Sequence, residues 1–410
     1  MSAALPLEVE RIRARFPALE RRQDGRPVAY FDGPGGTQVP REVGKAMAEY
    51  LFHHNANTHW NYPTSAETDA ALEAARATLA DFLNAEPAEV VFGLNMTSLT
   101  FHLARALGRR WGPGDEVLVT ELEHHGNVAP WQALERERGL TLRWVPFRRE
   151  DGTLDLEALT RTLSPRTRLV AAGAASNALG TVTDAARVCA LAREAGALAL
   201  VDAVHSAPHL LPDVRAAGCD FLVCSAYKFY GPHIGILWGQ RDLLEALDVP
   251  KVEPAPDSAP ERLETGTQNH EGIVGAAAAV DFLASLAPER TRRGALAAAY
   301  QAQQQRNQRL FYRLWEGLGT IPGVRRFGPP PHLPRTPTLG FVVEGMPSSQ
   351  VARRLAAEGL FLSHGDFYAA TVVERLGLAP EGLVRAGCAC YTTEEEIERL
   401  IAALAALAPD

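Results

Sequence analysis

Cysteine and strongly basic segments are both scarce in this chain, and each scarcity removes a class of protein. Five cysteines among 410 residues are few and odd in number, which argues against a disulfide framework and favours a reducing compartment. Lysine and arginine number 41 against 49 acidic residues, a net charge of −8, and no basic stripe typical of nucleic-acid binders is present. We therefore expect a cytoplasmic protein that does not bind nucleic acid.

Long uncharged apolar runs are also missing. No stretch reaches the roughly 20 residues that a membrane-spanning helix needs, so no membrane association is expected. No secretory signal would tolerate the charged residues near the start, which are Glu8, Glu10, Arg11, Arg13 and Arg15. Hydrophobic residues nevertheless make up 46% of the 410 residues, enough for a large core, and the length suggests two or three domains.

Apolar runs alternate with amphipathic helical stretches between about residues 70 and 245, the pattern of βα units around a mostly parallel sheet. The runs are rich in Val, Leu and Ala without polar alternation, as in strands covered on both faces. Seven strands are predicted, at residues 90–92, 116–120, 140–146, 168–172, 198–202, 221–225 and 235–238. Helices are predicted between them, at residues 98–107, 130–138, 156–163 and 185–195.

The pattern changes after about residue 250, where a loop rich in Pro, Asp and Ser spans residues 250–260. A short strand is predicted at 338–343, and helices at 275–286, 290–318, 349–358 and 394–407. The whole pattern predicts an α/β protein with a large domain built on a mostly parallel seven-stranded sheet and a smaller α+β C-terminal domain. The expected limits are 26–275 and 276–410, with an N-terminal segment, 1–25, that packs on the small domain.

Two side chains at the carboxyl ends of predicted strands suggest a shared site. Lys228 follows the strand at 221–225 in aromatic surroundings, which depress a lysine pKa and make the amine a usable nucleophile toward an aldehyde. Asp202 ends the strand at 198–202, and 228 − 202 = 26 residues, one βα unit plus the next strand, separate the pair. Taken alone, Lys228 can be a surface lysine and Asp202 a turn or capping residue. Together they match pyridoxal 5′-phosphate (PLP), whose aldehyde bonds a lysine and whose protonated pyridine nitrogen needs an ionic partner.

A phosphate seat is expected where a helix begins, because free backbone N–H groups and the helix dipole favour an anion. The strand at 90–92 is followed by a short turn and a helix, so the candidates are Thr97 and the amides of Asn95 and Met96. Ser225, three residues before Lys228, can add a hydroxyl to the same phosphate. An ordinary capped helix is the alternative interpretation.

Three further side chains follow predicted strands. His124 can stack on the pyridine ring, Asn177 can donate to the phenolic oxygen of the cofactor, and His205 can approach that oxygen as well. No metal is expected, since Pro208 interrupts the helix that would align His205 with His209, and no zinc-binding cysteine or histidine motif is present.

Taken together and in their order along the chain, the motifs at these strand ends resemble class V PLP enzymes of the aminotransferase family. The strongest resemblance is to the cysteine desulfurase and selenocysteine lyase branch, specifically its cysteine desulfurase-like members. The resemblance extends from about Tyr30-Phe31-Asp32 to the C-terminal helix. The motifs that carry it are Glu123-His124-His125, Ser176-Asn177-x-Leu179-Gly180-Thr181, Val201-Asp202-Ala203-Val204-His205, Ser225-x-x-Lys228-x-Tyr230-Gly231-Pro232 and Glu264-Thr265-Gly266-Thr267-Gln268-Asn269.

The resemblance implies PLP fold type I and a role for each matching residue. Lys228 matches the lysine that holds PLP as a Schiff base, Asp202 the partner of the pyridine nitrogen, and His124 the stacking histidine. Asn177 matches the residue at the phenolic oxygen, and Ser225 and Thr97 match phosphate ligands. Two further matches are Arg385, for the arginine that holds the substrate α-carboxylate, and Thr267, for a threonine that reaches the phosphate of the neighbouring subunit. A homodimer with shared active sites and a small amino-acid substrate are therefore implied.

Departures from the family pattern leave the reaction open. Members with desulfurase activity carry a loop cysteine that becomes a persulfide, whereas the corresponding segment here, 362–368, has none. Cys388 and Cys390 alternate with small residues, which suggests one face of a buried strand and inert packing. His205 and Tyr227 stand where desulfurases usually have Gln and His. The resemblance implies C–S or C–Se lyase chemistry; the alternatives are aminotransferase, epimerase, racemase or β-lyase chemistry, or a non-catalytic partner protein of the same fold.

Overall fold

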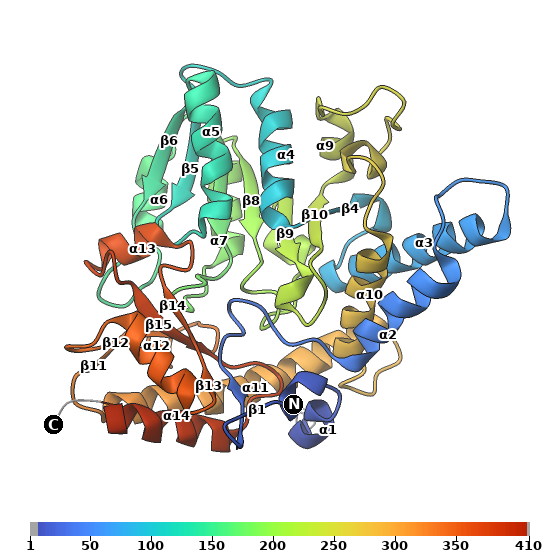
Figure 1. Cartoon of the computed structure of the whole chain (residues 1–410). Helices are drawn as coiled ribbons and strands as arrows, with labels where there is room; N and C mark the ends of the chain where they lie inside the picture. Colours follow the sequence, from blue (N-terminus) through green and yellow to red (C-terminus); the bar gives the residue numbers. More distant parts are fainter. Residues whose placement is uncertain (1–6, 408–410) are drawn as a thin grey trace.

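A seven-stranded sheet forms the centre of the larger part of the protein, in a computed structural model that describes residues 7–407 (Figure 1). The strand order is β4-β10-β9-β8-β7-β5-β6, and every neighbouring pair is parallel except those of β10, which runs antiparallel to β9 and β4. The strands are β4 (Val90–Gly93), β5 (Glu116–Thr120), β6 (Thr141–Val145), β7 (Thr167–Gly173), β8 (Leu198–Asp202), β9 (Phe221–Ser225) and β10 (Gly235–Gly239). The predicted mostly parallel α/β sheet is confirmed, with each strand end within one residue of its expected position.

Helices cover both faces of this sheet, which explains why its strands lack polar alternation. Successive residues of a strand point to opposite faces, so Leu118 packs in one apolar core while Val117 and Val119 pack in the other. The second core is closed by α4 (Met96–Gly108) and α5 (Ala129–Arg138). The first is closed by helices that include α3 (Pro63–Leu83), α6 (Leu156–Thr162), α7 (Ala185–Glu194) and α10 (His270–Ala284).

A second, smaller sheet is antiparallel and has the order β11-β12-β15-β14. Its strands are β11 (Val324–Phe327), β12 (Thr338–Val343), β14 (Ser363–Gly365) and β15 (Leu383–Gly387). They share an apolar core with α11 (Arg292–Gly319), α12 (Ser348–Ala357) and α14 (Glu394–Leu407). Figure 1 shows this part beneath the large sheet, with α11 running along its base and α13 (Ala370–Arg375) reaching back toward the large sheet.

Some elements differ from the sequence prediction. The helices α2 (Arg41–Glu49) and α3 were not predicted, and the helix expected at 275–286 begins earlier, at His270. It does so because the side chain of Asn269 accepts the N–H of Gly272 at 2.9 Å and caps the helix there. Position 275, the expected domain limit, therefore falls inside α10. The remaining short elements are α1 (Val9–Arg13), α8 (Val214–Ala217), α9 (Arg241–Ala246), β1 (Arg22–Gln23), β2 (Arg26–Pro27), β3 (Ala29–Tyr30) and β13 (Leu360–Phe361).

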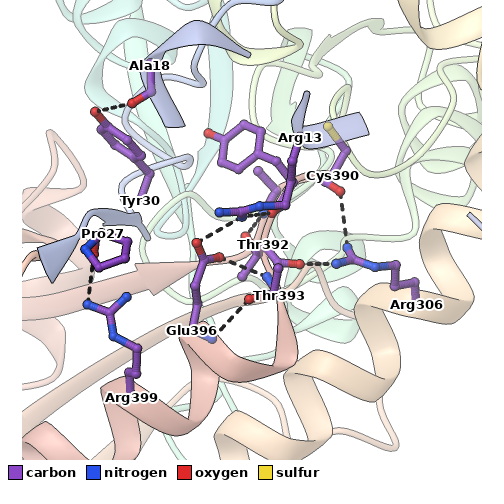
Figure 2. Close-up of polar contacts among 12 residues, drawn as sticks. Arg13, Ala18, Pro27, Tyr30, Arg306, Cys390, Thr392, Thr393, Glu396 and Arg399 are labelled. Carbon is purple, nitrogen blue, oxygen red and sulfur yellow. Dashed lines mark hydrogen bonds and ion pairs between the residues drawn. The ribbon is translucent and has the colours of Figure 1, made fainter. Parts of the chain in front are cut away.

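The N-terminal segment is tied by polar contacts to the C-terminal part of the chain (Figure 2). Arg13 donates to the carbonyl oxygen of Tyr391 at 2.6 Å and pairs with Glu396 at 2.9 Å. Arg399 on α14 donates to the carbonyl oxygen of Pro27 at 2.9 Å. Residues 1–6 and 408–410, the outer ends of the expected N-terminal segment and small domain, lie outside the described residues. Among residues 7–407, no helix is both long and apolar enough to cross a membrane.

Candidate active site

A cavity of 530 Å³ lies at the carboxyl ends of the parallel strands. The loops that follow β4, β5, β7, β8 and β9 all contribute to its wall, as expected for an open parallel sheet. The structure brings together nine of the predicted site residues here: Asn95, Met96, Thr97, His124, Asn177, Asp202, His205, Ser225 and Lys228. Arg385 and Thr267, the two others, are not part of this wall.

Lys228 ends a short 3₁₀ turn directly after β9, with only 8% of its surface exposed. Its Nζ donates to the carbonyl oxygens of Pro34 and Gly35, the latter at 3.0 Å. Burial, reinforced by the positive charge of Arg385 and opposed by Asp202, lowers the pKa of Lys228 to about 7. A substantial fraction of the amine is therefore uncharged, and nucleophilic, at neutral pH.

Asp202 is the last residue of β8 and lies deep in the same cavity wall. Its Oδ1 accepts the N–H of Val204 at 2.9 Å. Burial raises the pKa of Asp202 to about 7, against the opposing hydrogen bond from Val204, with a further rise from the charge of Glu123 and a fall from that of Lys228. The carboxylate is thus poorly compensated by the protein, and a cationic or N–H group of a ligand would stabilise its charged form.

Glu123 stands out in the sequence only as part of a motif, yet it lines the same cavity. Its carboxylate accepts from Thr120 Oγ1 at 2.6 Å, Asn127 Nδ2 at 2.7 Å and the backbone N–H of Gly173 at 2.8 Å. Burial nevertheless raises its pKa. This network ties the ends of β5 and β7 together. The available signal was its position just past a strand end, the same signal that singled out Asp202.

The expected phosphate seat lies at the start of α4, which begins at Met96, two residues before the predicted start. Asn95 caps the helix, its side chain accepting the N–H of Ser98 at 2.9 Å. The N–H of Asn95 donates to Ser98 Oγ at 3.2 Å and that of Met96 to Ser225 Oγ at 3.0 Å. Contrary to the prediction, neither amide is free to bind an anion. The amide of Thr97 has no hydrogen-bond partner among the described residues and faces the same cavity. Ser225 therefore connects the helix start with the Lys228 turn.

His124 lies beside this seat, and its ring is neutral. Its Nδ1 accepts the N–H of Gly126 at 2.9 Å, which leaves the proton of the neutral ring on Nε2. Burial, together with the charge of Lys228, lowers the pKa of His124 to about 4. The ring lies 5.6 Å from that of Tyr368 at an angle of 45°. An uncharged, flat imidazole at this position has the form that stacking on an aromatic ligand requires.

Asn177 and His205 face the cavity from the loops after β7 and β8. One N–H of the Asn177 amide donates to the carbonyl oxygen of Phe367 at 2.9 Å, while its Oδ1 is buried and has no partner among the residues that the structure describes. His205 Nε2 lies 3.1 Å from the hydroxyls of both Thr336 and Thr338. Burial lowers the pKa of His205 well below its usual value, so its ring is neutral too.

Arg385 lies on β15 behind this wall, with 3% of its surface exposed. Its Nε donates to Ser363 Oγ at 3.2 Å, its Nη1 donates to the carbonyl oxygen of Asn177 at 2.9 Å, and its guanidinium lies 4.0 Å from the ring centre of Phe367. Burial lowers its pKa to about 9, so it remains cationic at neutral pH. The Phe367 ring thus covers part of this guanidinium. Phe367 and Tyr368, at φ 57° and 56°, already adopt the left-handed conformation that non-glycine residues disfavour.

Thr267 lies apart from the other predicted residues. It lines a separate cavity whose other residues include Thr58, His59 and Val252. Within one chain it does not meet the phosphate seat.

The cysteines lie away from the cavity around Lys228. All five are buried and free, and none lines the cavity around Lys228. Burial raises the pKa of the Cys388 and Cys390 thiols to about 12. The expectation that both lie on one face of a strand is wrong, because β15 ends at Gly387 and the chain then turns away; their inert, buried character follows from the surrounding core instead.

Comparisons with known proteins agree with this geometry. The model of the family described as Aminotransferase class-V matches residues 29–400. The chain belongs to this family. It is 35% identical to a cysteine desulfurase of Synechococcus elongatus over 98% of its length, spanning 64% of that relative, and 35% identical to one of Pectobacterium carotovorum over 97% of both chains. The predicted resemblance to the cysteine desulfurase-like branch is confirmed.

Solved structures support the same fold. A cysteine desulfurase of Thermococcus onnurineus in its apo form has a TM-score of 0.88 at 28% identity and covers 99% of both chains. A mutant of a protein named C-DES, 22% identical with a TM-score of 0.80 over 96% of this chain and 98% of that one, carries glycine covalently linked to a PLP cofactor. The latter likeness bears on the fold alone.

Proposed function

We propose that the protein is a PLP-dependent enzyme that cleaves the C–S or C–Se bond of a small amino acid and releases sulfur or selenium directly, without a persulfide on the enzyme. Direct release without a persulfide is supported by the burial of all five cysteines away from the cavity. A sulfur-accepting thiolate must be exposed and of low pKa, and Cys388 and Cys390 have neither property.

The residues of the cavity fit PLP. Lys228 offers an amine of low pKa to the aldehyde, and the desolvated carboxylate of Asp202 would hold the proton of the pyridine nitrogen. The Thr97 amide and the Ser225 hydroxyl would hold the phosphate at the start of α4. The neutral ring of His124 would stack on the cofactor, and Asn177 and His205 would lie at its phenolic oxygen.

When bound, PLP withdraws the electrons left behind as a bond to the substrate Cα breaks. The chain supplies the rest. Arg385 would hold the α-carboxylate once the 366–368 segment moves, and Lys228 Nζ, with a pKa of about 7, would take the proton from Cα. Closure of the 366–368 segment would then exclude water from the site.

For L-cysteine the overall reaction consumes one water and yields pyruvate, ammonium and hydrogen sulfide. The Cα–H bond breaks with the proton going to Lys228. The Cβ–S bond breaks with the electron pair leaving on sulfur, and water replaces the amine to give the keto acid. No external oxidant or reductant is needed.

The test is the identity of the co-product. We expect the PLP-loaded protein to form sulfide and pyruvate from L-cysteine in equal amounts, unchanged in the Cys388→Ser/Cys390→Ser variant and abolished in Lys228→Ala. Alanine in place of pyruvate, with sulfur retained on the protein, would contradict direct release. A protein that stays colourless with added PLP would instead indicate the non-catalytic partner.

The proposal includes a cytoplasmic homodimer with shared active sites. Large apolar side chains are exposed along residues 51–62 and at Val252, beside the cavity that contains Thr267; Phe52 and Trp60 are 78% and 62% exposed. A patch of this kind is typical of a protein interface.

If Thr267 completes the partner's phosphate seat, inactive Lys228→Ala and Thr267→Ala chains should regain activity when mixed, because one site of the heterodimer then has both native residues. Unchanged inactivity in a verified heterodimer would contradict sharing.

A further inference from the structure

A second, smaller cavity of 190 Å³ lies between α11 and the segment 331–337. It is separate from the cavity around Lys228, and Thr336, which contacts His205, forms part of its wall. His209 also lines it, with its ring 5.8 Å from that of His205. The proposed reaction uses none of its polar groups except through the Thr336–His205 contact.

Several residues that line this cavity have buried polar atoms with no hydrogen-bond partner within residues 7–407. Asn307, only 4% exposed, makes no hydrogen bond to any described residue through either Nδ2 or Oδ1. His209 Nδ1 and Arg335 Nη1 are likewise buried without a hydrogen-bond partner in the described part of the chain. Leaving such groups unpaired typically costs about 1–3 kcal/mol each, so a cluster of them on residues that line one cavity points to a site for a polar ligand.

The charge of the cavity selects the ligand class. Arg335 forms no ion pair among residues 7–407, and none of the lining residues is acidic. Its guanidinium is held in place by the ring of Phe311, 3.7 Å from ring centre to Cζ, and by the carbonyl oxygen of Leu179, at 3.1 Å from Nη2. Burial lowers its pKa to about 9, which leaves it cationic at neutral pH, whereas burial lowers the pKa of His209 to about 3, which leaves it neutral. The cavity wall therefore contains one positive charge and three carboxamides, those of Gln304, Asn307 and Gln308.

We propose that this cavity binds a small carboxylate, with Arg335 Nη1 and Asn307 Nδ2 donating to its oxygens and Asn307 Oδ1 accepting from a hydroxyl or ammonium group on the same molecule. The volume is large enough for about six waters, and so for an organic acid of a few carbon atoms. The site is independent of the reaction proposed for the Lys228 cavity.

L-Lactate is a suitable probe because it has a carboxylate and a hydroxyl but no amine that could react with PLP. Binding would be measured by calorimetry and by the rise in melting temperature of the PLP-loaded protein, with chloride at equal ionic strength as the reference. We expect saturable binding that is at least about tenfold weaker in Asn307→Leu and in Arg335→Met, as the loss of a hydrogen bond to a charged group requires. Gln301→Leu, the same kind of change at an exposed position of α11, should bind like the wild type.

Asn307→Leu separates the possible outcomes because it leaves Arg385 and the whole PLP cavity intact. Binding that persists in this variant would place lactate elsewhere, for example at Arg385, and overturn the proposal. A shift no larger than that of chloride would mean that water alone fills the cavity, and would overturn it as well. Arg335 also donates hydrogen bonds to the carbonyl oxygens of Leu179 and Thr338, so Arg335→Met can fold poorly. In that case the Asn307→Leu variant alone tests the proposal.

Discussion

Replacing Asp202 by Asn should make the cofactor-free protein more stable, and increasingly so as pH rises. The folded pKa of Asp202 is about 7 against an ordinary value of 3.8, because burial disfavours the charge. In an unfolded chain the carboxyl ionises near 3.8, so folding carries no penalty below that pH. The penalty grows as pH rises and becomes constant above 7. It amounts to about 2 kcal/mol at pH 5 and about 4 kcal/mol at pH 8.

Asn has nearly the shape of Asp, can keep the hydrogen bond from Val204, and does not ionise. The melting temperature of PLP-free Asp202→Asn should therefore exceed that of the PLP-free wild type at pH 8, and by less at pH 5. Added PLP should stabilise the wild type far more than the variant, since the ionic partner of the pyridine nitrogen is gone. A gain that does not depend on pH, or no gain at pH 8, would refute the claim that Asp202 is a desolvated carboxylate prepared for a ligand.

Three further substitutions test separate parts of the site. Gly126→Ala should weaken PLP binding at least about tenfold, because the added Cβ would lie 2.7 Å from Thr97 Oγ1 and 3.0 Å from His124 Nδ1; equal affinity in a cofactor titration would contradict the proposed phosphate seat. Arg385→Lys should raise KM for the amino acid about 10-fold to 100-fold while leaving the absorbance of bound PLP unchanged, since a lysine cannot form the two-pronged contact; an unchanged KM would remove Arg385 from substrate binding. Thr336→Val/Thr338→Val should shift the pH midpoint of the bound-cofactor absorbance, because both hydroxyls contact His205 Nε2 and the valines would leave that ring nitrogen without these partners; an unchanged midpoint would separate His205 from the cofactor's phenolic oxygen.

The sequence was informative wherever a local rule determines the position of a residue. An apolar strand that ends in a polar residue places Asp202 at the sheet edge, and a strand followed by a helix places Thr97 at the helix start. The same periodicity predicted all seven strands. It did not reveal α3, whose buried residues are mostly small and depend on packing against α10 for their burial.

Features that depend on contacts between distant segments could not be predicted in this way. Examples are the Phe367 ring over Arg385, the hydrogen bond from the Met96 amide to Ser225, and the hydrogen bond from the Gly173 amide to Glu123. Each joins parts of the chain that no spacing rule connects. The same holds for the cavity at Asn307, formed by a helix and a proline-rich segment. Such contacts decide which amides and charges remain free for a ligand, and so they decide the chemistry.

The central claim is that Lys228 holds the cofactor, and the small number of lysines makes a direct test possible. The chain has three: Lys45, Lys228 and Lys251. Reduction of the PLP-loaded protein with borohydride, followed by peptide mass spectrometry, would locate the attachment. We predict a pyridoxyl group on Lys228 alone. Lys45 is exposed, and Lys251 donates a hydrogen bond to the carbonyl oxygen of Ala255 and forms an ion pair with Asp257. Modification of either other lysine in place of Lys228, or of none, would contradict the account.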